Sequence, residues 1–269
     1  MSDETDDAAA LETIHFLSGS RYRREILDAF VEHDTLTRQG VRDAVSASRS
    51  TVRRTVEAFI ERGLIDSVTA GYRLTAAGRL LADGLNDMVD RTRIVGEYEP
   101  FFRRLDASDH GLDPAWLDGA TMTVSTETNP YRPAQTQTET VREAATFRGF
   151  LPAIEIEGAR LVHERITNGA FGAEIIVPAT MRDTLRSDPF ASLFREQLAT
   201  DRFDCWLAEE TLPFYLGLPD EEGVEVGVDE DGIPRVLVQS TEPAFRSWGD
   251  ETFDRYRTSA TRLTRDDLP

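Results

Sequence analysis

The stretch from Val45 to Ile65 constrains the fold more than any other part of this sequence. Its apolar residues recur at helical spacing, which places them on one stripe of an α-helix. These residues are Val52, Val56, Phe59 and Ile60. Ser48 stands where an N-cap hydroxyl can accept a hydrogen bond from a free first-turn amide, and Arg62-Gly63 suits the other end. We therefore predict an amphipathic helix that begins at Ser48 and ends near Arg62.

The opposite face of this helix is polar and rich in donors. Its residues are Arg49, Ser50, Arg53, Arg54 and Glu57. Arginine can pair bidentately with phosphate and with the major-groove edge of guanine. The face could belong to a recognition helix that reads DNA, but an ordinary amphipathic helix with a solvated arginine face also fits.

The flanking segments favour the recognition helix. A short helix is predicted over 37–45, joined through Ser46-Ala47, a turn of helix-turn-helix length. Two short strands, 64–68 and 72–75, follow around Thr69-Ala70-Gly71 and form the hairpin of a winged helix. That hairpin could meet backbone phosphates. The predicted DNA-binding residues are Arg38, Arg42, Ser48, Arg49, Ser50, Thr51, Arg53, Arg54, Tyr72 and Arg73.

Charge is distributed unevenly along the chain. The 269 residues carry a net charge of −19, and all 30 basic residues are arginine, with no lysine. Acid-rich, lysine-free surfaces suit concentrated salt, so we expect a halophilic archaeal source. Residues 35–56 hold five arginines against Asp43 alone, which makes one positive island. In molar KCl, long-range repulsion between the acidic remainder and DNA would be screened.

Several kinds of chemistry are excluded or unsupported. Without lysine there is no P-loop phosphate lysine and no Schiff-base catalysis. His163-Glu164 lacks the second histidine of a zinc motif, because Thr167 stands there. Cys205 is the only cysteine, which rules out an intrachain disulfide and favours a core position. We expect a cytoplasmic protein that is not an enzyme, with no cofactor, no metal and no membrane segment.

One long helix is predicted from Ala76 to Glu99. Five of its residues step by 4, 3, 4 and 3, the spacing of a coiled-coil seam. They are Leu81, Leu85, Met88, Thr92 and Val95. Because two-fold dimers read paired DNA half-sites, we predict a homodimer helix. A helix packed only on its own domain would show a similar pattern.

The remaining sequence predicts an α/β (α+β) fold. Three parts are expected: a winged helix-turn-helix over 1–75, a connecting and dimerisation helix over 76–106, and an α/β effector domain over 107–269. Strand and helix signals alternate and then give way to a meander, which predicts a mixed sheet covered by helices. Residues 126–137 are predicted as a loop, 138–146 as a helix, 147–154 as a strand and its exit, 229–232 as a turn, and 243–263 as a closing helix.

A small-molecule effector is expected in the second half. Open α/β sheets bind ligands beyond the carboxyl ends of their strands. The residues near such ends are Ser125, Thr126, Gly149, Pro152, Pro178 and Thr180. The same residues also suit turns and helix starts.

Taken together, the motifs resemble a known family. They are Ser48–Arg54, Glu61–Ile65 and Leu74–Arg79 in the first half, and Arg148–Pro152, His163–Gly169, Leu212–Leu218 and Phe245–Gly249 in the second. The sequence resembles haloarchaeal winged-helix transcriptional regulators whose effector domain was first described in a methanogenesis (filament) regulator. This resemblance implies a DNA-binding repressor or activator with a sensor domain distantly similar to phospholipase D folds. The histidine-X-lysine chemistry of those enzymes requires a lysine that this chain lacks.

Two other functions remain open. The chain could be an α/β hydrolase-like enzyme with an accessory winged helix, for which turnover that survives deletion of 1–75 would be decisive. It could also be an interaction scaffold, for which partner capture without binding to double-stranded DNA would be decisive.

Overall fold

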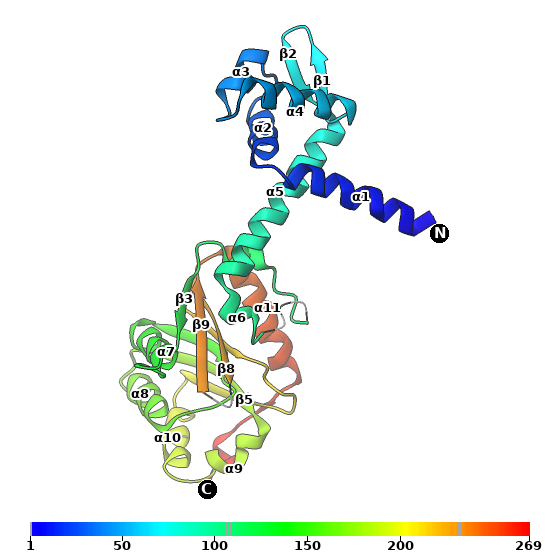
Figure 1. The fold of residues 1–269 in the computed structure, drawn as a ribbon. Helices are drawn as coiled ribbons and strands as arrows, with labels where there is room; N and C mark the ends of the chain where they lie inside the picture. The colour runs from blue at the N-terminus through cyan, green and yellow to red at the C-terminus, as the bar shows by residue number, and fades with distance from the viewer. Residues whose placement is uncertain (1, 106, 108, 231–232) are drawn as a thin grey trace. The chain divides into compact units, whose positions relative to one another are not determined.

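The computed structural model describes residues 2–105, 107, 109–230 and 233–269, and its contacts divide the chain into two units, 1–93 and 94–269 (Figure 1). Asp106, where the predicted connecting segment ends, and Asp231-Gly232 of the predicted turn lie outside the described residues. The three-part domain division stays a prediction.

The N-terminal unit contains four helices followed by a hairpin. They are α1 (Ser2–Ser18), α2 (Arg21–Glu32), α3 (Arg38–Asp43), α4 (Arg49–Glu61), β1 (Ile65–Val68) and β2 (Gly71–Leu74). The two strands pair antiparallel, and Leu36 adds an isolated bridge to Tyr72. The predicted order of two short helices and a hairpin is confirmed. The helix α5 (Ala76–Glu97) then continues across the boundary between the units.

Most of the predicted stripe of α4 forms the N-terminal core. Val52, Val56 and Phe59 are buried, and Phe59 has no exposed surface. Burying a phenylalanine completely contributes about 1.5–3 kcal/mol. Ile60 was placed on this stripe but is 39% exposed, and Thr55 is buried in its stead. Ser20 stands at the N-cap of α2, but its side chain makes no capping hydrogen bond.

An eight-stranded mixed sheet forms the centre of the C-terminal unit, in the order β10-β6-β5-β4-β7-β8-β9-β3. Its strands are β3 (Thr121–Val124), β4 (Thr146–Phe150), β5 (Gly172–Pro178), β6 (Phe203–Ala208), β7 (Tyr215–Pro219), β8 (Val224–Glu230), β9 (Ile233–Ser240) and β10 (Thr261–Arg262). The pairs β4–β5 and β5–β6 are parallel, and the other pairs are antiparallel. The predicted α/β class with a mixed sheet is confirmed.

Helices cover both faces of this sheet (Figure 1). They are α6 (Glu99–Phe102), α7 (Arg132–Glu143), α8 (Ile156–Thr167), α9 (Arg182–Leu185), α10 (Phe190–Gln197) and α11 (Pro243–Ser259), with 3-10 turns at Pro114–Leu117, Ala179–Met181 and Arg265–Asp267. Phe245 and Phe253 of α11 pack with Phe150 in one core. Ile166 of α8 and Phe194 of α10 pack with the other face in a second core.

The predicted bounds of two helices in this unit are wrong. The expected loop 126–137 contains the start of α7, because the helix begins at Arg132 and ends at Glu143. The first turns of this helix were not predicted because threonine is a weak helix former. In the structure, the hydroxyls of Thr136, Thr138 and Thr140 each donate to a backbone carbonyl four residues earlier in the same helix. The closing helix predicted to Leu263 ends at Ser259, where the chain turns to pair with β6. The strand and its exit predicted over 147–154 are confirmed, since β4 ends at Phe150.

Candidate nucleic-acid interface and ligand cavity

The start of α4 is fixed by Ser48. Its Oγ accepts from the backbone N–H of Thr51 at 3.2 Å and lies 2.9 Å from the hydroxyls of Ser50 and Thr51. The predicted N-cap is confirmed. Free backbone N–H groups and the helix dipole at such an end attract anions, so Arg49 and Ser50 stand beside an anion-attracting helix start.

The arginines predicted to bind DNA are exposed. Within the described part of the chain, Arg42, Arg49, Arg54 and Arg73 take part in no ion pair. Arg53 lies 3.9 Å from Glu57 one helical turn on, with its side chain 77% exposed. Exposed pairs of this kind contribute only about 0.3–0.5 kcal/mol. These guanidinium groups can therefore turn toward a phosphate or a base at small cost.

The start of α3 and the hairpin are tied together at Leu36 and Tyr72. Their backbones exchange two hydrogen bonds of 2.9 Å, and the Nε of Arg38 donates to the Tyr72 hydroxyl at 3.0 Å. Gly71 closes the turn at φ 142°, where a Cβ would lie 2.2 Å from the Leu36 carbonyl oxygen. The structure thus brings together two of the predicted DNA-binding residues, Arg38 and Tyr72.

The seam predicted on α5 divides into two groups. Leu81, Met88 and Val95 are exposed by 39%, 56% and 43%, and the Thr92 hydroxyl donates to the Met88 carbonyl. Leu85 is only 8% exposed and packs in the N-terminal core. A partner helix could therefore contact Leu81, Met88 and Val95, but not the buried Leu85.

The six predicted effector residues serve the fold in several ways. Gly149 lies inside β4, where a Cβ would come within 2.2 Å of the Leu216 carbonyl oxygen. The backbone N–H of Ser125 donates to the carbonyl oxygen of Arg235, and Thr126 closes a turn with Asn129. Pro152 follows β4, Pro178 ends β5 and Thr180 lies in the next 3-10 turn.

The C-terminal unit contains a cavity of about 530 Å³ that none of these six residues lines. It is bordered by Asp118, Gly119, Thr121, Thr140, Pro219, Gly223, Val224, Glu225, Gln239, Ser240, Thr241 and Glu242. Asp220, in the β7–β8 turn beside it, accepts from the N–H groups of Ala145 and Thr146. The cavity therefore lies at the amino end of β4, whereas the sequence prediction looked at the carboxyl ends.

A buried carboxylate borders this cavity. Glu225 is 2% exposed, and its two oxygens accept three hydrogen bonds. The Thr140 hydroxyl and the Gln239 amide, at 2.5 and 2.6 Å, donate to Oε1, while the Tyr215 hydroxyl donates to Oε2 at 3.0 Å. Burial raises the pKa of Glu225, and the three donors oppose that rise only in part. Burial and the neighbouring Glu225 raise the pKa of Tyr215.

Gly217 makes room for this cluster. The strand register places Gly217 opposite Glu225 and Gly149 opposite Gly217. A Cβ on Gly217 would lie 2.6 Å from the Tyr215 hydroxyl and 3.1 Å from Glu225 Oε2. The Tyr215 side chain thus reaches Glu225 only because residue 217 has no side chain. Sequence reasoning missed Glu225 because a glutamate in a strand beside an acidic turn looks like a solvated residue.

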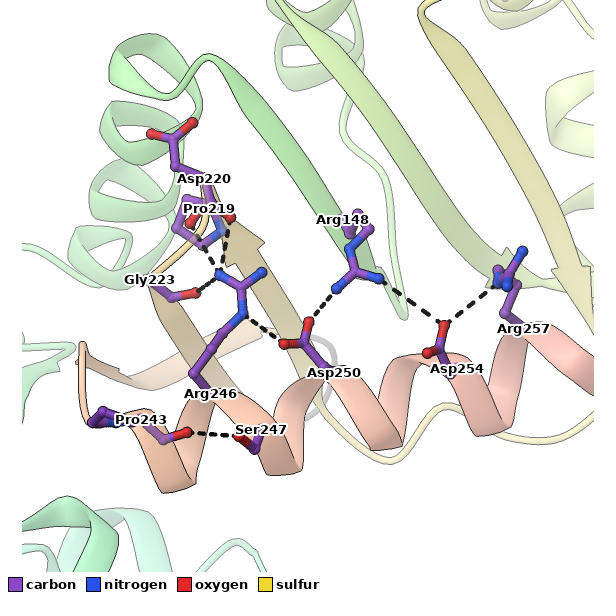
Figure 2. Close-up of polar contacts among 10 residues, drawn as sticks. All are labelled: Arg148, Pro219, Asp220, Gly223, Pro243, Arg246, Ser247, Asp250, Asp254 and Arg257. Carbon is purple, nitrogen blue, oxygen red and sulfur yellow. Dashed lines mark hydrogen bonds and ion pairs between the residues drawn. The ribbon is translucent and has the colours of Figure 1, made fainter.

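An arginine network fastens the edge of the cavity to α11 (Figure 2). Arg246 Nη1 donates to the carbonyls of Pro219, Asp220 and Gly223 at 3.3, 3.0 and 2.7 Å, and its Nε donates to Asp250 at 3.1 Å. Figure 2 also shows that Arg148 bonds to the same Asp250 from β4. Both arginines belong to sequence motifs noted above. Arg246 holds the β7–β8 turn on α11, and Arg148 ties β4 to the same helix.

Two family models match the chain. Residues 130–259 match the middle domain of the methanogenesis regulatory protein FilR1, and residues 11–95 match the HVO_A0261 N-terminal domain. The resemblance inferred from the sequence is confirmed. The cavity residues Thr140, Glu225 and Gln239 lie within the first match, and α4 lies within the second. No curated protein matches the sequence significantly.

Solved structures overlap the chain more loosely. TrmBL2, described as an archaeal chromatin protein with a novel mode of DNA binding, is 12% identical with a TM-score of 0.43, over 93% of this chain and 98% of its own. Nuc, a phospholipase D family member from Salmonella typhimurium, is 8% identical with a TM-score of 0.43, over 54% of this chain and 99% of its own. NucT from Helicobacter pylori is 10% identical with a TM-score of 0.38, over 54% and 98%.

The remaining chemistry-bearing residues form no further centre in the described residues. Cys205 is fully buried, as predicted for a core residue, and burial raises the pKa of its thiol. No group of three or more His, Cys, Asp or Glu side chains in the described part of the chain is placed to hold a metal ion. Among the helices described, none combines the length and the apolar character needed to cross a lipid bilayer.

Proposed function

We propose that this chain is an archaeal DNA-binding transcriptional regulator and not an enzyme. The observation that carries the proposal is the exposed, largely unpaired arginine face of α4, which follows a Ser48-capped helix start on a chain of net charge −19. The match to a regulatory protein's middle domain supports the same function. The acid-rich, lysine-free composition supports a halophilic source.

The proposed mode of binding uses three elements. α4 enters the major groove with Arg49, Ser50 and Arg53 toward base edges, as recognition helices do. Arg42 of α3 and Arg73 of the hairpin contact phosphates on either side. The tie between Arg38 and Tyr72 supports this geometry, because it holds the hairpin against the start of α3.

We further propose that the regulator is a homodimer joined through α5. Leu81, Met88 and Val95 supply the apolar contacts, since large side chains exposed on one helix favour a partner surface. A Met88→Asp variant should have the mass of a monomer in size-exclusion chromatography with light scattering, and it should bind paired DNA half-sites weakly. A wild-type chain that is monomeric at micromolar concentration would contradict the dimer but not DNA binding itself.

DNA binding can be tested with one substitution and a matched control. Duplex fragments retained by the wild-type protein in KCl would first be selected from genomic DNA. Arg53→Ala should then weaken binding to the selected duplex by roughly 5- to 150-fold, the effect of losing one base contact of about 1–3 kcal/mol. Arg103→Ala, a similarly exposed arginine at the C-cap of α6, serves as the control and should leave affinity unchanged. Equal affinity for both variants would reject α4 as the reading helix.

A further inference from the structure

The Glu225 cluster has no ready explanation in the fold alone. Among the described residues, Glu225 is the one acidic residue that is buried, with 2% of its surface exposed. Its three partners, Thr140, Tyr215 and Gln239, are neutral, and none of the described residues places a cation against it. A buried carboxylate without a cation is unfavourable. It therefore suits a site where a cation arrives with a ligand.

The lining of the adjacent cavity also favours a positively charged ligand. It includes the carboxylates of Asp118, Glu225 and Glu242, and no arginine or histidine is among its lining residues. Hydroxyl oxygens of Thr121, Thr140, Ser240 and Thr241 supply further acceptors. A phosphate or carboxylate ligand would meet like charges here and find no cationic partner. A ligand with positive charge and N–H donors would meet complementary groups on several sides.

We propose that this cavity binds a small organic cation, a protonated amine or a guanidinium compound, with Glu225 as its buried counter-ion. Thr140 and Gln239 hold the Glu225 carboxylate in place, and Glu242 supplies further negative charge at the lining. The binding itself is independent of the regulator assignment; only its role as an effector signal rests on that proposed function.

Hydrogen bonds around the cavity would link such a ligand to other elements of the C-terminal unit. Pro219 and Gly223 line the cavity, and their carbonyl oxygens are held by Arg246 of α11 (Figure 2). A cation bound at Glu225 would thus stabilise the β7–β8 turn that this arginine fastens. Thr140 extends the same contact to α7.

Calorimetric titration of the full chain in KCl, with agmatine and putrescine as probes, tests the proposal. Sorbitol is the neutral probe and citrate the anionic one. One or both cations should bind the wild type, while sorbitol and citrate should not. Glu225→Gln should weaken the binding roughly thirtyfold or more, the loss that follows when one partner of a buried charge pair is removed. Glu221→Gln, an exposed glutamate of the same turn that does not line the cavity, should change nothing.

A second variant covers the case in which Glu225→Gln does not fold. Thr121 is exposed and lines the cavity, so Thr121→Trp should block cation binding without disturbing the core. Absence of cation binding to the wild type, or equal binding to wild type and blocked variants, overturns the proposal. So does Glu225-dependent binding of sorbitol or citrate. Because DNA affinity is measured separately, either result leaves the regulator assignment to its own test.

Discussion

The arginine face of α4 and the Glu225 cluster place charge in opposite surroundings. On α4, guanidinium groups project into water with weak partners or none, so moving them requires little energy. At Glu225, one carboxylate is enclosed by three neutral donors and bordered by a cavity. We infer from this difference that the arginine face of α4 suits a large, charged partner that binds from solvent. The cavity beside Glu225 suits a small ligand that replaces water.

The largest expected effect comes from removing the exposed arginines of α4. Combined replacement of Arg49, Arg53 and Arg54 by alanine should lower DNA affinity by roughly 100-fold or more, since each lost contact contributes about 1 kcal/mol or more. Binding should also depend less on KCl concentration, because fewer counterions are released. Anisotropy titrations over a range of KCl would show both changes. An unchanged melting temperature would confirm that the fold is intact, whereas an unchanged salt slope would argue against phosphate contacts.

A pair of glycine substitutions tests how tightly the Glu225 cluster is packed. Gly217→Ala should destabilise the protein by about 1–3 kcal/mol, because its Cβ would crowd Tyr215 and Glu225 in a packed interior. Gly158→Ala in α8, where a Cβ would meet nothing within 4 Å, should stabilise by about 0.4–1 kcal/mol. Denaturant unfolding measures both. Similar free energies for the two variants would mean that the Glu225 cluster is not tightly packed.

Protonation of Glu225 gives the next effect. Burial raises its folded pKa above the unfolded value, so this group favours the folded state at low pH and loses that contribution as pH rises through the folded pKa. Glu225→Gln removes the titration. Relative to wild type, the variant should therefore gain free energy of unfolding as pH rises above about 4, the ordinary pKa of glutamate. Parallel pH profiles for the two proteins would contradict the assigned direction.

The smallest expected effect is at the start of α4. Ser48→Ala removes a capping acceptor and should cost about 0.5–2 kcal/mol of stability, with Ser48→Gly losing only a few tenths. DNA affinity should fall slightly through looser placement of Arg49. Thermal unfolding and anisotropy of the two variants would separate the cap from a direct DNA contact: if the alanine and glycine proteins bind DNA equally weakly, Ser48 touches the duplex itself.

Local sequence signals predicted the two regions unequally. The helical stripe, the Ser48 cap and the turn at Gly71 are set by residues close together in the chain, and all three are found in the structure, apart from Ile60 of the stripe. The Glu225 cluster joins residues from α7, β7, β8 and β9 that are up to 99 positions apart. Its strands are antiparallel, so the rule about carboxyl ends of parallel strands pointed elsewhere. Gly217 and Thr140 had no local pattern to reveal their roles.

One cleavage experiment tests the central claim most directly. Cys205 is fully buried, so Ser50→Cys offers a single reactive thiol at the start of α4 for an iron-chelate reagent that cuts nearby DNA. Bound to its selected duplex, the labelled protein should cut both strands at a short interval within each half-site. The same label at Glu221→Cys in the other unit is the control and should not produce that pattern. A Ser50-labelled protein that binds the duplex but leaves it uncut would contradict the placement of α4 in the groove.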